Sequence, residues 1–143
     1  MGARGERLTA LFCGSQDWRD ERIIFACMWG LYEIIDNMED GLTIIHTDDR
    51  GAGQLAGRCA KKIESFNRGV LRAAELKILE YPIDPSQFTP VLGYARNQKM
   101  LEDNNPDLLF AFVPDIAASP GTAHVLELAK EREIPSYLIQ RYC

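Results

Sequence analysis

Apolar residues along the chain follow two alternating patterns, short continuous runs and longer segments with an apolar residue every three or four positions. The short runs are rich in aliphatic and β-branched residues and predict strands; they cover 8–13, 42–46, 76–81, 108–113 and 136–139. The longer segments predict helices, and they cover 20–37, 52–66, 94–102 and 121–132. Three prolines between 82 and 90 predict a loop before the third helix.

Regular alternation of strand and helix is typical of a parallel sheet with helices on both faces. The run 108–113 is almost uninterrupted in apolar residues, which indicates a central strand covered on both sides. No change in composition divides the chain, so residues 1–143 are predicted to form a single domain. The predicted fold is therefore α/β, with a doubly wound five-stranded parallel sheet in a three-layer sandwich.

Composition and charge narrow the function classes. The 143 residues are 46% hydrophobic and 26% charged, as in ordinary globular proteins. No apolar run reaches the roughly 20 residues of a membrane span, so we expect no membrane as a partner. The net charge of −5 argues against nucleic acid as a partner, because contacts to phosphates supply most of that affinity.

Cysteine and histidine usage indicates the compartment and the metal chemistry. The cysteines are far apart in the sequence, which favours reduced thiols in a cytoplasmic protein; they are Cys13, Cys27, Cys59 and Cys143. The two histidines, His46 and His124, are interpreted as ordinary structural residues with satisfied polar atoms. With no clustered thiols, we expect no metal site, and we expect no cofactor.

Glycines and polar residues follow the predicted strands, where open α/β sheets bind ligands. The segment 119–122 is the best phosphate candidate: Gly121 allows close approach, the helix start offers free N–H groups, and Thr122 adds a hydroxyl. Gly14 and Ser15 repeat this arrangement after the first strand. Arg96, next to Asn97, offers a bidentate contact to phosphate or carboxylate.

Three further candidates have two interpretations each. Trp18 either stacks on a base or shields its loop, and Asp48 and Asp49 either bind a ribose hydroxyl or a cation or form a solvated turn. The glycines at 51, 53 and 57 differ in spacing from the dinucleotide fingerprint and are interpreted as structural, with Gly57 allowing close packing of helix and sheet. The segments 14–15 and 119–122 also fit a plain turn and a plain helix cap.

Four motifs in order resemble one family. The segment 14–18, GSQDW, resembles a G-S-R-D-W signature, and 46–56 resembles an h-G-G-x-x-G-A-D-x-x-A loop and helix start. The segment 93–100, GYARNQKM, resembles a G-x-x-R-N-x-x-M helix, and 106–112 followed by 121–123 resembles P-D-x-x-x-A-F…G-T-A. Together they resemble the YspA-like (cpYpsA-related) branch of the SLOG superfamily, which includes DprA and the Lonely Guy phosphoribohydrolases. The resemblance covers nearly the whole chain.

The resemblance implies a Rossmann-like fold, with strand order 3-2-1-4-5, that binds a nucleotide or a nucleotide-derived ligand. It implies as ligand-binding residues Gly14, Ser15, Gly51, Arg96, Asn97, Gly121 and Thr122. Some positions depart from the family pattern. Gln16 replaces an Arg, Thr47 and Asp48 replace paired glycines, and Gly53 replaces an Asp.

The resemblance also bears on enzymatic activity. Lonely Guy enzymes resemble this chain in having an Arg in the position of Arg96, but they place a Glu where this chain has Val125. Glu127 lies two residues further on and faces another side of the helix. The hydrolysis of N-glycosidic bonds relies on carboxylates, and no residue is assigned a catalytic role.

Three functions therefore remain as hypotheses. The first is a small cytoplasmic nucleotide-binding domain of SLOG type, acting as a ligand sensor. The second is a nucleoside-monophosphate phosphoribohydrolase, an N-glycosidase. The third is a protein-interaction module that has lost its ligand. In addition, the helix Asp20–Asn37 is apolar on more than one face, through residues such as Phe25, Trp29 and Tyr32, and this predicts a homodimer. The alternative is a helix that neighbouring loops bury.

Overall fold

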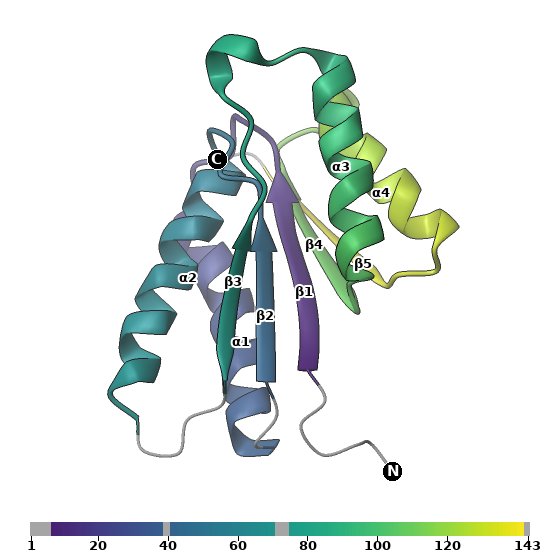
Figure 1. Ribbon diagram of the computed structural model, residues 1–143. Coiled ribbons are helices and arrows are strands. Elements are labelled where there is room, and N and C mark those ends of the chain that lie inside the picture. The colour runs from purple at the N-terminus through teal and green to yellow at the C-terminus, as the bar shows by residue number, and fades with distance from the viewer. Residues whose placement is uncertain (1–6, 39–40, 71–74, 142–143) are drawn as a thin grey trace.

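The computed structural model describes residues 7–38, 41–70 and 75–141 (Figure 1). Five strands alternate with four helices, and two short 3₁₀ turns lie in the loops. The strands are β1 (Arg7–Gly14), β2 (Gly41–His46), β3 (Leu76–Glu80), β4 (Leu108–Val113) and β5 (Ser136–Gln140). The helices are α1 (Glu21–Met38), α2 (Ala52–Arg68), α3 (Pro90–Asn104) and α4 (Pro120–Glu131), and the turns are η1 (Pro85–Gln87) and η2 (Ile116–Ala118).

All five strands are parallel and lie in the order β3-β2-β1-β4-β5. Ala10 of β1 pairs with Ile44 of β2 on one side, and Phe12 pairs with Phe110 of β4 on the other. Strands β2 and β3 are thus added on one side of β1, and strands β4 and β5 on the other. Open α/β sheets bind ligands at this switch in strand order, between β1 and β4. This confirms the predicted α/β class and the doubly wound, Rossmann-like order 3-2-1-4-5.

Helices cover both faces of the sheet and define two apolar cores (Figure 1). On one face, α1 and α2 pack on Phe12, Ile44 and Phe112. On the other face, α3 and α4 pack on Leu11 and the other residues of the second core. Apolar side chains thus leave both sides of β1, which explains why its residues from Ala10 to Cys13 are all apolar and buried.

Helix α3 begins at Pro90, four residues before the predicted start at 94. Thr89 caps the helix, because its side-chain oxygen accepts a hydrogen bond from the Leu92 N–H at 3.2 Å. Proline is well tolerated at the first helical position, where its missing N–H has no partner to lose. The predicted loop 82–90 is therefore shorter, and it contains the turn η1.

The apolar sides of α1 that suggested a homodimer are largely occupied within the chain. Met28 and Tyr32 are buried, and Trp29 lies edge-on to Phe66 of α2 with ring centroids 5.0 Å apart. Ile34 is the most exposed large apolar side chain described on α1, at 57%. The homodimer stays a prediction. No helix in the described ranges has the length and apolarity needed to cross a lipid bilayer.

Candidate functional site

A pocket of about 310 Å³ opens at the carboxyl ends of β1 and β4, between α3 and α4. This volume lies within the range of small-molecule sites, which starts at about 300 Å³. Most predicted site residues line it: Gly14, Ser15, Asp49, Arg96, Asn97, Gly121 and Thr122. The other lining residues are Cys13, Gln16, Asp17, Thr47, Phe88, Pro90, Gly93, Tyr94, Ala118, Ser119, Pro120 and Val125. Seven of the ten candidate residues thus lie around one pocket, and their role in ligand binding stays a prediction.

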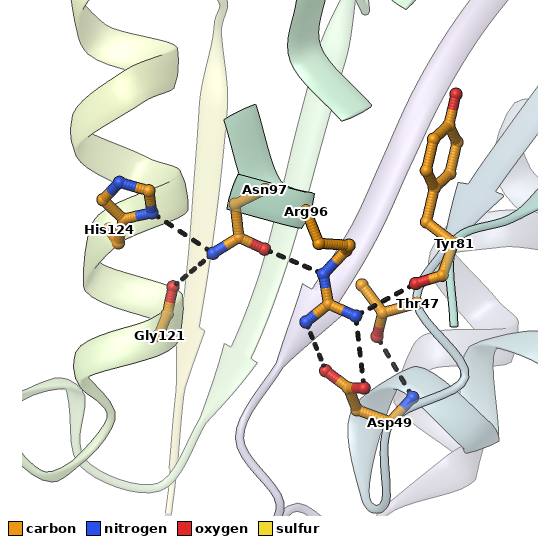
Figure 2. A network of polar contacts seen from close by, with 7 residues as sticks. All are labelled: Thr47, Asp49, Tyr81, Arg96, Asn97, Gly121 and His124. Atoms are coloured by element: carbon orange, nitrogen blue, oxygen red, sulfur yellow. Dashed lines mark hydrogen bonds and ion pairs between the residues drawn. The ribbon is translucent and has the colours of Figure 1, made fainter. Parts of the chain in front are cut away.

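A chain of polar contacts crosses the pocket from α4 through α3 to the loop after β2 (Figure 2). Asn97 is 3% exposed, and its Nδ2 donates to the Gly121 carbonyl at 3.4 Å and lies 3.3 Å from Nδ1 of His124. Its Oδ1 accepts from Nε of Arg96 at 3.2 Å. Asn97 therefore fixes both the start of α4 and the plane of the Arg96 guanidinium.

Arg96 is paired with a carboxylate from the same chain. Its Nη2 donates to Oδ2 of Asp49 at 2.7 Å, and its Nη1 donates to Oδ1 of Asp49 at 3.3 Å and to the Tyr81 carbonyl at 3.0 Å. With the Asn97 contact, four of the five guanidinium N–H groups are engaged in the structure. Arg96 was predicted to contact a phosphate or a carboxylate, and in this structure it pairs with the carboxylate of Asp49, which neutralises its charge.

The start of α4 offers unpaired backbone donors to the pocket. Ser119 precedes the helix but makes no side-chain cap, and Pro120 occupies the first helical position. A Cβ built on Gly121 meets nothing within 4 Å, so there is open space at this point of the pocket wall. Thr122 is buried at 5% exposure and also lines the pocket. This geometry suits an anion, which a helix N-terminus favours.

Gly14 is required by packing. A Cβ on Gly14 would lie 2.2 Å from the Phe112 carbonyl oxygen and 2.7 Å from Cβ of Ala52. The next residue, Ser15, is held in place because its N–H donates to that same carbonyl at 3.0 Å and its Oγ accepts from the Asp17 N–H at 2.9 Å. Gly14 therefore lets strand and helix close beneath the pocket.

Three predicted candidates lie outside this pocket. Gly51 has a positive φ of 83°, and a Cβ there would lie 2.4 Å from the Ser15 carbonyl oxygen, so this glycine serves the turn. Trp18 is 1% exposed and packs on Phe112, which corrects the idea that it stacks on a base. Asp48 is exposed and does not line the pocket, although its neighbour Asp49 does.

Two aromatic residues at the pocket were not predicted. Phe88 and Tyr94 are 45% and 41% exposed, and both line the pocket. The Tyr94 ring stacks on His124 with centroids 4.3 Å apart, while Phe88 lies over Gly93, where a Cβ would be 3.1 Å from its ring. The sequence offered one aromatic residue in the proline-rich loop, Phe88, and one at the predicted start of the next helix, Tyr94, but it did not show how the loop places them at the pocket.

Cys13 also lines the pocket without offering a reactive thiol. Burial raises the pKa of Cys13 to about 12, against a smaller lowering by the Arg96 charge, and Asp49 raises it further. A thiol with this pKa stays protonated at neutral pH and is a poor nucleophile. Among the described residues, one group of side chains lies close enough together to hold a metal ion, and it lies outside this pocket; it consists of His46, Asp48 and Glu80.

Comparisons with known proteins give no relative: no family model, no curated protein sequence and no solved structure matches the chain. Membership of the SLOG superfamily therefore stays a prediction from the motifs.

Proposed function

We propose that the chain is a small-molecule-binding domain whose ligand is a nucleotide or nucleotide derivative, as the SLOG resemblance implies. The observation that carries the proposal is the pocket between β1 and β4, which combines free helix donors with exposed aromatic rings. A nucleotide matches both features, because its phosphate is an anion and its base has flat aromatic faces that stack on aromatic side chains.

The anion is proposed to lie at the start of α4. The open space beside Gly121 lets the phosphate oxygens approach the backbone, and the Thr122 hydroxyl adds a donor. Arg96 contributes a further N–H while Asp49 holds it in place. Because Asp17 and Asp49 both line the pocket beside a single described cation, strong anion binding must come mainly from the helix start.

The base is proposed to lie against Phe88 and Tyr94. Exposed aromatic side chains at a pocket wall are the groups on which bases stack. Asp17 follows the first strand, is exposed and lines the same pocket, so its carboxylate is available to a ribose hydroxyl.

Binding is favoured over hydrolysis of the N-glycosidic bond. Val125 lines the pocket where the Lonely Guy resemblance calls for a glutamate, and Glu127 is exposed and is not part of the wall. The methyl groups of Val125 cannot stabilise an oxocarbenium-like centre as a carboxylate does. The protein-interaction hypothesis is less favoured because the pocket remains open.

The test compares thermal melting and calorimetric titration with AMP, ADP-ribose, adenosine and inorganic phosphate. The nucleotides are expected to raise the melting temperature more than adenosine or phosphate alone, since binding to the folded state stabilises it. Gly121→Asp places a carboxylate in the open space and is expected to weaken nucleotide binding at least tenfold. Ala123→Asp, on the same turn but outside the pocket, is the matched control.

An acidic residue is well tolerated in the first turn of a helix, so both variants are expected to fold. The proposal fails if no nucleotide shifts the melting curve at millimolar concentration, or if the two variants bind nucleotide equally well. Release of free base during the titration would instead favour the N-glycosidase.

A further inference from the structure

His46 departs from its interpretation as a satisfied structural histidine. It ends β2 and is 1% exposed, yet its Nδ1 has no hydrogen-bond partner within the described chain. Its Nε2 lies 3.9 Å from Oε2 of Glu80, which is too long for a hydrogen bond. The Gly53 backbone also acts on this ring, but a buried imidazole whose Nδ1 has no hydrogen-bond partner is costly unless something else binds it.

Two carboxylates converge on this ring. Glu80 lies beside His46 in the register of β2 and β3, and Asp48 follows two residues later. One ligand atom from each of the three side chains lies within 4.8 Å of the others. Within the described part of the chain, neither carboxylate has a lysine or arginine within 4.0 Å, so their charges are not neutralised by a paired cation.

The protein backbone is shaped around the imidazole. A Cβ on Gly57 of α2 would lie 2.7 Å from Cε1 of His46, so a glycine at this position lets the helix pack on the ring. The predicted packing role of Gly57 is thereby confirmed.

We propose that His46, Asp48 and Glu80 form a binding site for a divalent transition-metal ion such as Zn²⁺. One nitrogen and two carboxylate oxygens suit these ions better than Mg²⁺ or Ca²⁺, which prefer oxygen ligands alone. Ligand atoms around tetrahedral zinc lie about 3.4 Å apart. The exposed side chains of Asp48 and Glu80 close the remaining gap toward the fixed imidazole.

The site is separate from the nucleotide pocket. Thr47 and Asp49 line that pocket, whereas His46, Asp48 and Glu80 do not. Three protein ligands leave coordination positions to water on the exposed side, as in zinc sites that exchange ligands. The two proposals therefore stand or fall independently.

The test is calorimetric titration of the untagged, reduced chain with Zn²⁺, and absorption spectroscopy with Co²⁺. We expect one equivalent of metal to bind and to raise the melting temperature. Glu80→Gln and Asp48→Asn are each expected to weaken binding at least tenfold while retaining the fold, because both side chains are exposed. His124→Gln, which removes the other histidine, is the matched control and is expected to bind as the wild type does.

Two results would overturn the site. One is equal Zn²⁺ affinity in wild type, Glu80→Gln and Asp48→Asn. The other is a thiolate-to-cobalt charge-transfer absorption, which would place the metal on cysteines instead. His46→Gln is measured alongside, and loss of binding with an unchanged circular dichroism spectrum would identify the imidazole as a ligand.

Discussion

Arg96 and Asp49 form a bidentate ion pair at the pocket wall, with Nη2–Oδ2 and Nη1–Oδ1 distances of 2.7 and 3.3 Å. The two residues are 47 positions apart in the sequence. The Arg96 side chain is 10% exposed and that of Asp49 is 30% exposed. The pair holds the guanidinium in a fixed orientation and also reduces its attraction for an incoming anion.

Asp49→Asn is expected to tighten the binding of phosphate and nucleotides several-fold, because the amide leaves the Arg96 charge uncompensated. The same change is expected to lower the free energy of unfolding by about 1–3 kcal/mol, since a charge-assisted contact at a largely buried guanidinium is weakened. Calorimetric titration with phosphate and urea unfolding measure the two effects. Weaker binding in Asp49→Asn would contradict the expectation and would mean that positioning by Asp49 outweighs neutralisation.

Cys13 makes a specific contribution to stability at alkaline pH. Burial raises its pKa to about 12, whereas an unfolded thiol titrates near about 8.5. Above that lower value the unfolded state loses a proton that the folded state keeps, so stability falls as pH rises, by up to about 1.4 kcal/mol per pH unit. Arg96 and Asp49 are the charges that act on this thiol.

Cys13→Ala is expected to flatten this pH dependence. The check is urea unfolding at several pH values between about 8 and 11, where the free energy of unfolding should decline less steeply in the variant. Cys59, whose pKa burial raises to about 11, is present in both proteins and cancels in the comparison. Parallel curves for the two proteins would show that Cys13 does not titrate as expected.

Two glycines in helices are expected to respond oppositely to alanine. A Cβ on Gly30 of α1 meets nothing within 4 Å, so Gly30→Ala should raise the free energy of unfolding by about 0.5–1 kcal/mol through the better helix propensity of alanine. Gly57→Ala should lower it by about 1–3 kcal/mol, because the new methyl meets the His46 ring. Thermal and urea unfolding give both values, and a shift of the same sign in both variants would refute the packing explanation.

The homodimer through α1 is tested at Ile34. If two copies associate there, Ile34→Glu is expected to convert the dimer to a monomer in light scattering coupled to size-exclusion chromatography, because it places a charge in the interface. Val91→Glu, at a position 76% exposed on α3, is the control and should leave the dimer intact. A wild type that is monomeric at all accessible concentrations would disprove the prediction.

The fold was predictable because each element has a local signal. Apolar runs and helical spacing locate the ends of the strands and helices to within two residues, except at the start of α3, because the cap Thr89 and Pro90 look like loop residues in isolation. The site was predictable where it depends on the carboxyl ends of strands, as at Ser15 and Thr122.

The partners of individual site residues were not predictable. The Arg96–Asp49 pair and the contacts of His46 depend on which side chains the sheet brings together across long stretches of sequence. Likewise, Trp18 lies in the core because of Phe112, almost a hundred residues later. Local patterns contain no information about such distances.

Helix α3 links the two halves of the sheet, which lie on either side of β1. Arg96 of this helix is hydrogen-bonded to the segments that follow β2 and β3, and Asn97 is hydrogen-bonded to the helix that follows β4 (Figure 2). A ligand that displaced Arg96 from Asp49 would therefore remove the ion pair on the β2 side of the sheet, while the contact between Asn97 and the start of α4 remained.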